Sequence, residues 1–407
     1  MDRRTLLKLS AAMALTACSQ TPIGLPAKRV VLVGAGIVGA SIAYHLAQRG
    51  VRVTVIDKLG PATQASRGTF AWINATWAKQ PRHYHAFNQQ GVATWASLRE
   101  HMDFPLRWGG SLEWFTETQR QQRLVDQIAE QVAWGEPARM IDEVEFAQLE
   151  PDLVLDGAMT AAYSPNDGAI DPVMATRQLL EEAARLGAKT VFPCAFEGVS
   201  RRHGRLTSVQ TSEGSIPADH VVLATGAETG MLPGLAGFEV PQRSTPGVIA
   251  LTRPMPRLLN RIIVAPGVHM HQRDDGRIVL GEQEGAPQNA AHAARLAGRP
   301  NEFPSAELGR QHARRMLDVA TNFCPGIAAA EIESVYIGWR PLPLDGHPVI
   351  GSHPAAPDLY IAVMHSGVTL APIVGQLAAH EIANEVVVGQ LDAYRPTRSF
   401  ENVKRYG

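Results

Sequence analysis

The clearest pattern of apolar and polar positions in the chain lies near its start. An apolar, β-branched run over residues 30–33 leads into a glycine-rich turn. An alanine-rich stretch follows and ends at Gly50, and a second β-branched run covers residues 51–56. This order predicts a strand, a helix and a second strand, which together form a βαβ unit. The glycine-rich turn consists of Gly34, Ala35, Gly36, Ile37, Val38 and Gly39.

The βαβ unit has the features of a dinucleotide site. In a G-x-G-x-x-G turn, Gly34 permits the tight turn, Gly36 lets the backbone approach a pyrophosphate, and Gly39 lets helix and strand pack closely. The helix N-terminus offers unpaired N–H groups to the phosphates. Asp57 ends the second strand, where a carboxylate accepts ribose hydroxyls. The turn alone leaves NAD and FAD open, and another kind of α/β protein with a glycine-rich turn is the alternative.

Beyond Asp57 the pattern predicts a mixed α/β chain. Helices are expected over residues 82–103, 116–134, 143–149, 172–187, 305–321 and 371–388. Strands are expected over residues 106–115, 189–199, 205–211, 219–224, 248–252, 262–264, 268–272, 277–281, 335–337 and 359–364. The strands between residues 248 and 281 should pair antiparallel, which is a different architecture from the βαβ start.

Composition narrows the class of protein. The chain has 407 residues, of which 45% are hydrophobic and 19% charged, so it is long enough for two globular domains. Its net charge of −1 suggests neither a nucleic-acid surface nor a polybasic membrane patch. Outside the N-terminus no apolar run is long enough to cross a bilayer.

The N-terminus has the features of a processing signal. A basic segment with the pair Arg3 and Arg4 precedes the apolar run 9–17 and Cys18. This order is typical of a twin-arginine export signal that ends in a lipobox, whose cysteine is lipidated after cleavage. We therefore expect a bacterial protein of the cell envelope or periplasm, attached to the membrane only through Cys18. The alternative is a mistranslated start or a frayed helix, and in that case the protein is cytoplasmic.

The remaining cysteines and the histidines do not predict a metal site. Cys194 and Cys324 are expected to be buried, unpaired thiols, because a protein folded before export folds in a reducing compartment. The sequence has neither a CxxC nor an HExxH motif, and its 14 histidines are scattered.

Four segments in a fixed order resemble the FAD-dependent D-amino acid oxidase family, whose members include glycine oxidase and monomeric sarcosine oxidase. The resemblance covers nearly the whole chain and is more specific than the glycine-rich turn alone. It implies FAD rather than NAD as the cofactor. The four segments are residues 34–39, 221–227, 338–341 and 365–372.

The resemblance also implies a fold and a division into domains. It implies an α/β fold in which a Rossmann-type FAD-binding domain is interwoven with an α+β substrate domain that carries an antiparallel sheet. The implied parts are a leader and linker at 1–27, the FAD-binding domain at 28–80, 158–240 and 336–392, the substrate domain at 81–157 and 241–335, and a tail at 393–407.

By position, the resemblance assigns cofactor contacts along the chain. The N–H groups of residues 367–369 and the dipole of the helix after them would face the flavin and stabilise its anionic reduced form. The implied contacts are residues 34–39 and Asp57 on the ADP half, Lys58, Ala65 and Ser66 along the pyrophosphate and ribityl chain, Ala71 and Trp72 at the flavin ring, Phe196 at the adenine, Thr225 and Gly226 over the nucleotide, and Gly367, Val368 and Thr369 at the flavin.

Substrate contacts are implied as well. Arg340, in the Gly-Trp-Arg-Pro segment, would pair bidentately with the substrate carboxylate, for which a planar guanidinium is suited. A surface salt bridge is the alternative for this arginine. His269 and Gln283 stand at substrate-facing positions where better-known relatives carry other residues. Gly338 stands where some relatives carry a flavin-linking cysteine, so the flavin contact there would be non-covalent.

The reaction that the resemblance implies is oxidation of an amino acid or an N-substituted amino acid. Hydride would pass from Cα to flavin N5, and oxygen or a quinone would accept the electrons. One alternative is oxidation of a 2-hydroxy acid by the same site. Another is a flavin-loaded electron-transfer or binding protein without its own turnover.

Overall fold

The structure is a computed structural model that describes residues 27–76, 79–231, 240–282 and 301–400. The helices are α2 Ile37–Gln48, α3 Arg82–Arg99, α4 Thr118–Ala133, α5 Glu143–Leu149, α6 Pro172–Arg185, α8 Ala306–Thr321 and α9 Gly367–Asn384, with short 3₁₀ turns η1 Gly226–Met231, η2 Pro325–Ala329 and η3 Gly389–Tyr394. The strands are β1 Arg29–Val33, β2 Arg52–Ile56, β3 Trp72–Ile73, β4 Leu106–Trp108, β5 Ser111–Glu113, β6 Arg139–Asp142, β7 Thr160–Ser164, β8 Gly168–Ile170, β9 Lys189–Val191, β10 Phe196–Arg202, β11 Arg205–Thr211, β12 Gly214–Pro217, β13 His220–Leu223, β14 Gln242–Thr252, β15 Ile262–Ala265, β16 Val268–Gln272, β17 Ile278–Glu282, β18 Ile332–Pro343, β19 Val349–His353 and β20 Ala356–Val363.

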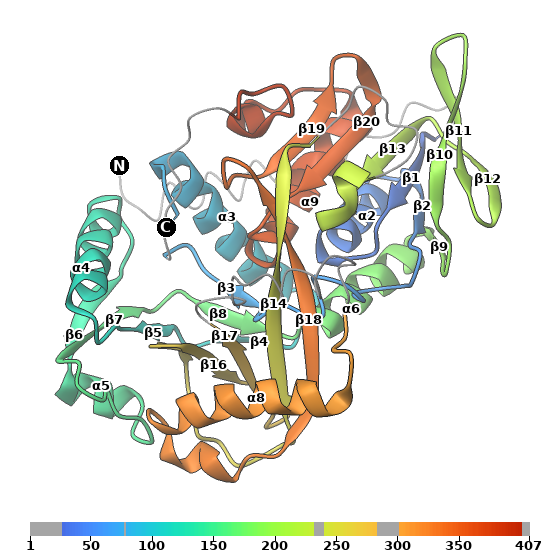
Figure 1. The fold of residues 1–407 in the computed structure, drawn as a ribbon. Coiled ribbons are helices and arrows are strands. Elements are labelled where there is room, and N and C mark those ends of the chain that lie inside the picture. The colour runs from blue at the N-terminus through green and yellow to red at the C-terminus, as the bar shows by residue number, and fades with distance from the viewer. Residues whose placement is uncertain (1–26, 77–78, 232–239, 283–300, 401–407) are drawn as a thin grey trace.

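A six-stranded sheet with the order β19-β20-β13-β1-β2-β9 forms one half of the molecule (Figure 1). Its strands run parallel except β19, which pairs antiparallel with β20. Strand β1 is apolar on both faces, as a parallel strand covered on both sides must be. Val30 and Leu32 pack into the cluster that contains α2, α6 and α9, whereas Val31 and Val33 pack against the small sheet β10-β11-β12.

An eight-stranded sheet with the order β18-β14-β17-β16-β15-β5-β7-β6 forms the other half. Helix α8 packs its apolar face on this sheet, as Ala313, Met316 and Leu317 show in the second core cluster. In Figure 1 the long strands β14 and β18 run from the level of the six-stranded sheet down to α8. The predicted fold, a Rossmann-type sheet interwoven with a unit that carries an antiparallel sheet, is confirmed.

Several predicted element boundaries are wrong. The expected strand 106–115 is two strands, β4 and β5, which separate at Gly110 and join different sheets. The expected strand 189–199 likewise divides into β9 and β10. The last helix begins at Gly367 instead of 371, and β18 extends from Ile332 to Pro343, beyond the predicted strand 335–337.

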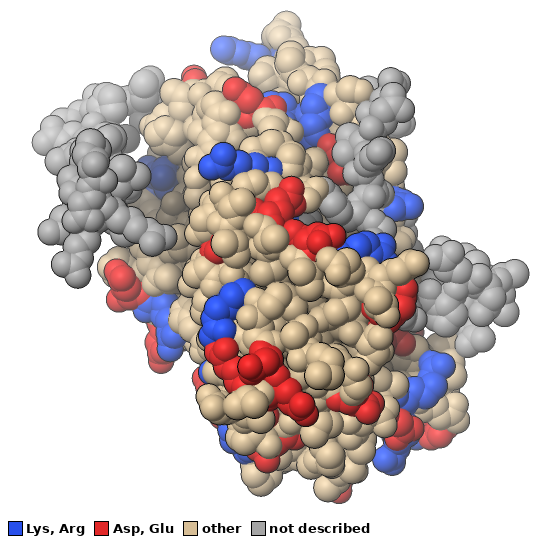
Figure 2. Space-filling view, turned by 90° about the vertical axis from the view of Figure 1, so that its left-hand side faces the viewer, with Lys and Arg blue, Asp and Glu red and all other residues tan. Residues whose placement is uncertain are grey.

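The structure also bears on the charges, the cysteines and the membrane. On the face shown in Figure 2, Lys and Arg are interspersed with Asp and Glu. Cys194 and Cys324 are both buried and free, as predicted. In the part of the chain that the structure describes, no helix is long and apolar enough to cross a membrane, and no group of three or more His, Cys, Asp or Glu could hold a metal ion. The leader and Cys18 lie outside the described residues.

Candidate functional site

The glycine-rich turn lies where the carboxyl ends of β1 and β13 meet. Gly34 has a φ of +105°, and a Cβ added to it would lie 2.5 Å from the carbonyl oxygen of Ala224. A Cβ on Gly39 would lie 2.0 Å from the carbonyl oxygen of Gly34. Only glycine fits at either position. The structure therefore gives Gly34 and Gly39 the roles that the sequence predicts for them, a tight turn and close helix packing.

The loop after β2 closes over the N-terminus of α2. The N–H of Ala35 donates to Asp57 Oδ2 at 2.9 Å, and the N–H of Ile37 donates to Ser66 Oγ at 3.0 Å. Asp57 Oδ1 also accepts from the backbone N–H groups of Leu59 and Gly60. Its carboxylate orders both loops and keeps lone pairs for a further donor. Contact with a ribose stays a prediction.

Gly36 begins α2 without a side-chain cap. Its φ and ψ are extended, and a Cβ there would lie 3.2 Å from Ser66 Oγ. Gly36 itself provides no cap and Ser66 Oγ takes only the N–H of Ile37, so the other N–H groups of the first turn and its positive dipole end are available to an anion. Ser66 and its neighbour Ala65 lie beside this end of the helix, where the sequence predicts the pyrophosphate.

The turn after β13 closes the opposite side of the glycine turn. A Cβ on Gly34 would lie 3.2 Å from the backbone nitrogen of Thr225, and Gly226 begins η1 with a φ of +55°. The hydroxyl of Thr225 lies 2.8 Å from that of Thr229. Lys58 Nζ donates to Glu228 Oε1 at 2.8 Å, which links the loop after β2 to η1. Lys58 therefore spans the two loops in this structure.

The backbone of the segment before Phe196 lies beside the loop after β2, which is predicted to bind the nucleotide. Its side chain packs in the core cluster behind β1. The N–H of Cys194 donates to the carbonyl oxygen of Asp57 at 2.7 Å, so the start of β10 lies next to the end of β2. This geometry is compatible with the predicted backbone contact to adenine, which stays a prediction.

The N-terminus of α9 packs against the first turn of α2. A Cβ on Gly367 would lie 3.3 Å from Cγ2 of Val38, although the two residues are far apart in the sequence. The indole N–H of Trp95 donates to the carbonyl oxygen of Val368 at 2.8 Å, and the hydroxyl of Thr369 donates to the carbonyl oxygen of Trp72 at 3.3 Å. Two helix N-termini thus meet at one place, which concentrates positive dipole ends there.

Trp72 and its neighbours connect the two halves of the molecule. Ala71 is buried with a φ of +62°, and the indole N–H of Trp72 donates to Asp167 Oδ2 at 2.9 Å. Gly338 faces Gly68, because a Cβ on Gly338 would lie 2.3 Å from the Gly68 carbonyl oxygen. Position 338 therefore has no room for a side chain on that side, where some family members carry a flavin-linking cysteine.

Arg340 lies on β18 opposite Thr245 of β14. Its Nη1 donates to the carbonyl oxygen of Pro246 at 3.0 Å, and a Cβ on Gly247 would lie 2.7 Å from its Nη2. The glycine thus leaves space for the guanidinium. Burial lowers the pKa of Arg340 although the charge of Glu282 opposes this shift. No ion pair joins Arg340 to a carboxylate within the described residues, and its role as a carboxylate ligand stays a prediction.

His269 faces the same region as Arg340. Its Nε2 is buried and has no hydrogen-bond partner, and its ring lies 5.4 Å from that of Phe70 and 6.4 Å from that of Trp72. Burial, and the charge of Arg340, lower the pKa of His269 to about 4. The imidazole is therefore neutral at pH 7. Gln283 lies outside the described residues.

The sequence analysis missed a second cation at this site, Lys79. Its Nζ donates to Ser366 Oγ at 2.7 Å, and the hydroxyl of Tyr84 donates to the same oxygen at 3.0 Å. Burial lowers the pKa of Lys79 to about 8, although the charge of Asp167 opposes this shift. The partner Ser366 is 287 positions away, so no local pattern could have indicated this contact.

His365 lies just before the N-terminus of α9. Burial and the charges of Lys79 and Arg340 lower the pKa of His365 to about 3. Part of its surface is exposed, and the next residue, Ser366, accepts from Lys79 Nζ.

The features described so far fit a dinucleotide that carries a flavin. The glycine turn offers space and N–H groups to a pyrophosphate, and the N-terminus of α9 offers a positive dipole end at the other side of α2. Within the described residues His269 Nε2 has no hydrogen-bond partner and the Arg340 guanidinium bonds one carbonyl oxygen, so both groups keep capacity for a ligand.

Comparison with known proteins supports this assignment. Residues 29–381 match the family described as FAD dependent oxidoreductase (DAO). The chain is 25% identical to a glycine oxidase of Geobacillus kaustophilus (strain HTA426) over 388 residues, which cover 92% of this chain and 98% of that protein.

Two solved structures show the same fold. The glycine oxidase structure from Geobacillus kaustophilus superposes with a TM-score of 0.80 at 24% identity, covering 91% of this chain and 99% of that one. The L-proline dehydrogenase structure from P. horikoshii gives a TM-score of 0.78 at 24% identity, covering 91% and 98%.

Proposed function

Since the chain belongs to the family of FAD-dependent oxidoreductases, we propose that it oxidises an amine that carries a carboxylate, either an amino acid or an N-substituted amino acid. The similarity to glycine oxidase supports an amino acid as the substrate class. When bound, FAD supplies the acceptor at N5 for hydride from the substrate Cα. The cofactor would be held by the glycine turn, Asp57, Ser66, Thr225 and the residues that begin α9.

The observation that carries this proposal is the guanidinium of Arg340. It is desolvated, and among the described residues it hydrogen-bonds one carbonyl oxygen, so donors remain for a ligand. An arginine fork matches a carboxylate in shape and charge, and such a pair is stronger than a neutral hydrogen bond. We assign Arg340 to the α-carboxylate of the substrate.

His269 complements Arg340. Because its imidazole is neutral at pH 7, it does not repel an ammonium or amine group, and its free Nε2 accepts or donates one hydrogen bond. We assign it to the substrate amine. With the carboxylate and the amine both held, Cα is fixed relative to the cofactor, and this positioning supplies much of the rate without a side-chain base.

The test is a substrate screen on the purified yellow protein under anaerobic conditions. Amino acids of both stereochemistries should bleach the flavin absorbance, and Arg340→Met should abolish bleaching while keeping the flavin bound. Bleaching by a 2-hydroxy acid and by no amine would replace the proposal with the 2-hydroxy acid reaction. If no small acid reduces the flavin, the protein is an electron-transfer or binding protein. Adding oxygen or a quinone analogue to the reduced protein then identifies the electron acceptor.

We also propose that FAD is bound non-covalently and that the protein is exported. Glycine at position 338 supports the first, because it offers no side-chain atom for a bond to the flavin. Acid precipitation should release all the flavin into the supernatant.

The twin-arginine segment before Cys18 supports the proposal that the protein is exported. The protein should fractionate with membranes, and Cys18→Ser should release it.

A further inference from the structure

One face of the eight-stranded sheet is covered by α8, and the other face meets the loop that leads from β2 to β3. Val268 and Met270 of β16 belong to the core cluster that contains α8. Because side chains alternate along a strand, His269 between them points to the opposite face. There the ring of Phe70, from the loop before β3, lies 5.4 Å from the imidazole of His269 between centroids. A loop that follows the six-stranded sheet thus borders a residue of the eight-stranded one.

Arg340 lies on the same face of the sheet as His269. Gly281 of β17 pairs with His269 on one side and with Ile249 on the other. Ile249 in turn pairs with Tyr336, and the pairing of β18 with β14 is continuous from Tyr336 to Arg340. Paired residues point to one face, and an even number of positions along a strand returns to it. The two residues that the proposed function assigns to the substrate therefore share one face.

Phe70 covers the side of His269 that is turned away from Arg340. A Cβ added to Gly281 would lie 3.4 Å from Cδ2 of Phe70, so the ring packs on the backbone of β17. The same ring lies 4.9 Å from that of His271 between centroids. In the register of the sheet, His271 follows His269 in the direction opposite to Arg340. The space beside His269 is therefore bordered by an aromatic ring at this end.

The two aromatic residues beside His269 are held in place. The carbonyl oxygen of Phe70 accepts from Nε2 of His271 at 3.0 Å. Trp72, whose ring lies 6.4 Å from that of His269, donates its indole N–H to Asp167 Oδ2 at 2.9 Å. The carboxyl of Asp167 is buried and accepts two further side-chain hydrogen bonds through the same oxygen. Residues fixed in this way exclude a ligand group by its size, because moving them breaks hydrogen bonds.

We propose that Phe70 sets the upper size of the group that the substrate carries on its amine nitrogen. The inference rests on the proposed function, in which Arg340 binds the carboxylate and His269 the amine, and it names a specificity-determining residue for it. His269 Nε2 is buried and has no partner among the described residues, so it is the atom left for the amine. With the carboxylate directed to Arg340, a group on the nitrogen extends past His269 to the side that Phe70 covers.

The first test measures binding by calorimetry without turnover. The flavin-loaded protein is titrated with methoxyacetate, ethoxyacetate, butoxyacetate and benzyloxyacetate, in which an ether oxygen replaces the amine nitrogen. In the parent protein benzyloxyacetate should bind about tenfold more weakly than methoxyacetate, although its larger apolar area favours burial. Phe70→Ala should raise the affinity for benzyloxyacetate about tenfold relative to methoxyacetate, because the ring that borders His269 is removed. Equal affinities in the parent, or an unchanged ratio in the variant, would overturn the proposal.

Further variants assign the effect to this ring. Phe70→Leu should change the ratio of affinities less than Phe70→Ala does, and it keeps apolar packing if alanine destabilises the loop. Phe115→Ala is the matched control, because Phe115 is likewise partly exposed but packs in the cluster beside α4. It should leave the ratio unchanged. Flavin content and the melting temperature establish that each variant is folded. An equal change of the ratio in Phe115→Ala contradicts the assignment to Phe70.

The second test separates this inference from the proposed function. Flavin reduction is measured with the best amine from the substrate screen and with its N-methyl, N-ethyl and N-benzyl derivatives. A rate that falls with the size of the nitrogen substituent, and recovers for the N-benzyl compound in Phe70→Ala, supports the inference. If the N-benzyl compound reduces the parent flavin as fast as the unsubstituted one, the inference fails and the proposed function stands. If the screen identifies no amine, the proposed function itself fails.

Discussion

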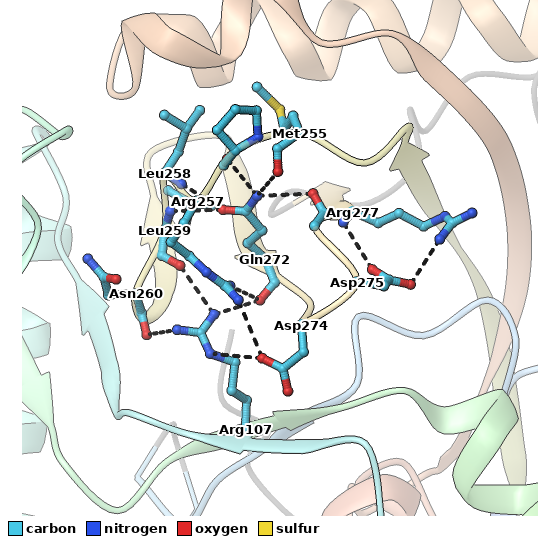
Figure 3. A network of polar contacts seen from close by, with 12 residues as sticks. Arg107, Met255, Arg257, Leu258, Leu259, Asn260, Gln272, Asp274, Asp275 and Arg277 are labelled. Carbon is cyan, nitrogen blue, oxygen red and sulfur yellow. Dashed lines mark hydrogen bonds and ion pairs between the residues drawn. The ribbon is translucent and has the colours of Figure 1, made fainter.

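Two regions of this molecule enclose cations, and they satisfy them in opposite ways. In the network of Figure 3, Arg107 donates to three backbone carbonyls, including that of Gln272 at 2.8 Å, and lies 3.7 Å from Asp274. Arg257 bonds the same carbonyl and the same aspartate. On β18, Arg340 has one carbonyl partner and no carboxylate partner within the described residues.

We interpret the difference as that between a cation that stabilises the fold, Arg107, and one that is proposed to bind a ligand, Arg340. In the network the chain itself supplies every partner drawn, and the side chain of Gln272 ties the segment before β15 to the hairpin β16-β17 through both its oxygen and its nitrogen. Removing such a cation leaves carbonyls without donors, which costs stability. Removing Arg340 leaves only one carbonyl without its donor, so the loss should fall on the ligand instead.

The largest effect is expected for Arg340→Met. The value of kcat/KM should fall about 10²- to 10⁴-fold, because two charged hydrogen bonds to the substrate are lost. The melting temperature should change little, since burial of the guanidinium is itself unfavourable. Steady-state kinetics and thermal unfolding of the flavin-loaded protein measure the two quantities. A variant that unfolds easily and keeps its kcat/KM would show that Arg340 stabilises the fold and does not bind the substrate.

Arg107→Met should show the reverse. The free energy of unfolding is expected to fall by about 1–3 kcal/mol, because several carbonyls lose a donor. The value of kcat/KM should stay within about threefold, a change of less than 1 kcal/mol in the barrier. Chemical denaturation measures the first quantity, and Arg202→Met, at an exposed position on β10, is the control for loss of a positive charge. Unchanged stability would mean that the network in Figure 3 contributes nothing to folding.

The free energy of unfolding should depend on pH through His269. The pKa of His269 is lowered from 6.5 to about 4 in the folded protein, so the unfolded chain binds more protons between these values. Stability therefore falls as pH decreases from 6.5 towards 4. His269→Gln should reduce that loss, whereas arginines do not titrate in this range. The measurement is the difference in unfolding free energy between variant and parent at pH 6.5 and pH 4.5. The prediction is wrong if the difference in unfolding free energy between variant and parent is the same at both pH values.

The smallest effect is expected for Lys58→Met. Its pair with Glu228 is partly exposed, with side-chain exposures of 47% and 36%, so the free energy of unfolding should change by less than about 1 kcal/mol. The FAD dissociation constant of the same variant tests the predicted contact with the pyrophosphate. A weaker affinity for FAD at unchanged stability is expected if the ammonium reaches the phosphates.

Much of the fold could be predicted because its signals are local. The start of α6 is an example, since Asp171 accepts from the N–H groups of Val173 and Met174 at 3.0 Å and Pro172 follows it, as the sequence pattern indicates. The segments 106–115 and 189–199 are interrupted by Gly109-Gly110 and by Pro193, but these residues alone could not show that the two pieces of each segment join different sheets. A periodicity identifies a strand and says nothing about its partner.

By itself the sequence determined the βαβ unit with its glycine turn, and it singled out Arg340 as a candidate substrate ligand. The turn from Gly34 to Gly39 lies within one βαβ unit, where neighbours in the chain are neighbours in space, and Arg340 stands in a recognisable segment. The tertiary structure alone decided that α9 begins against α2 and that Lys79 meets Ser366. These contacts join segments hundreds of residues apart, so their physical basis, packing and hydrogen bonding between distant segments, exists only in the folded chain.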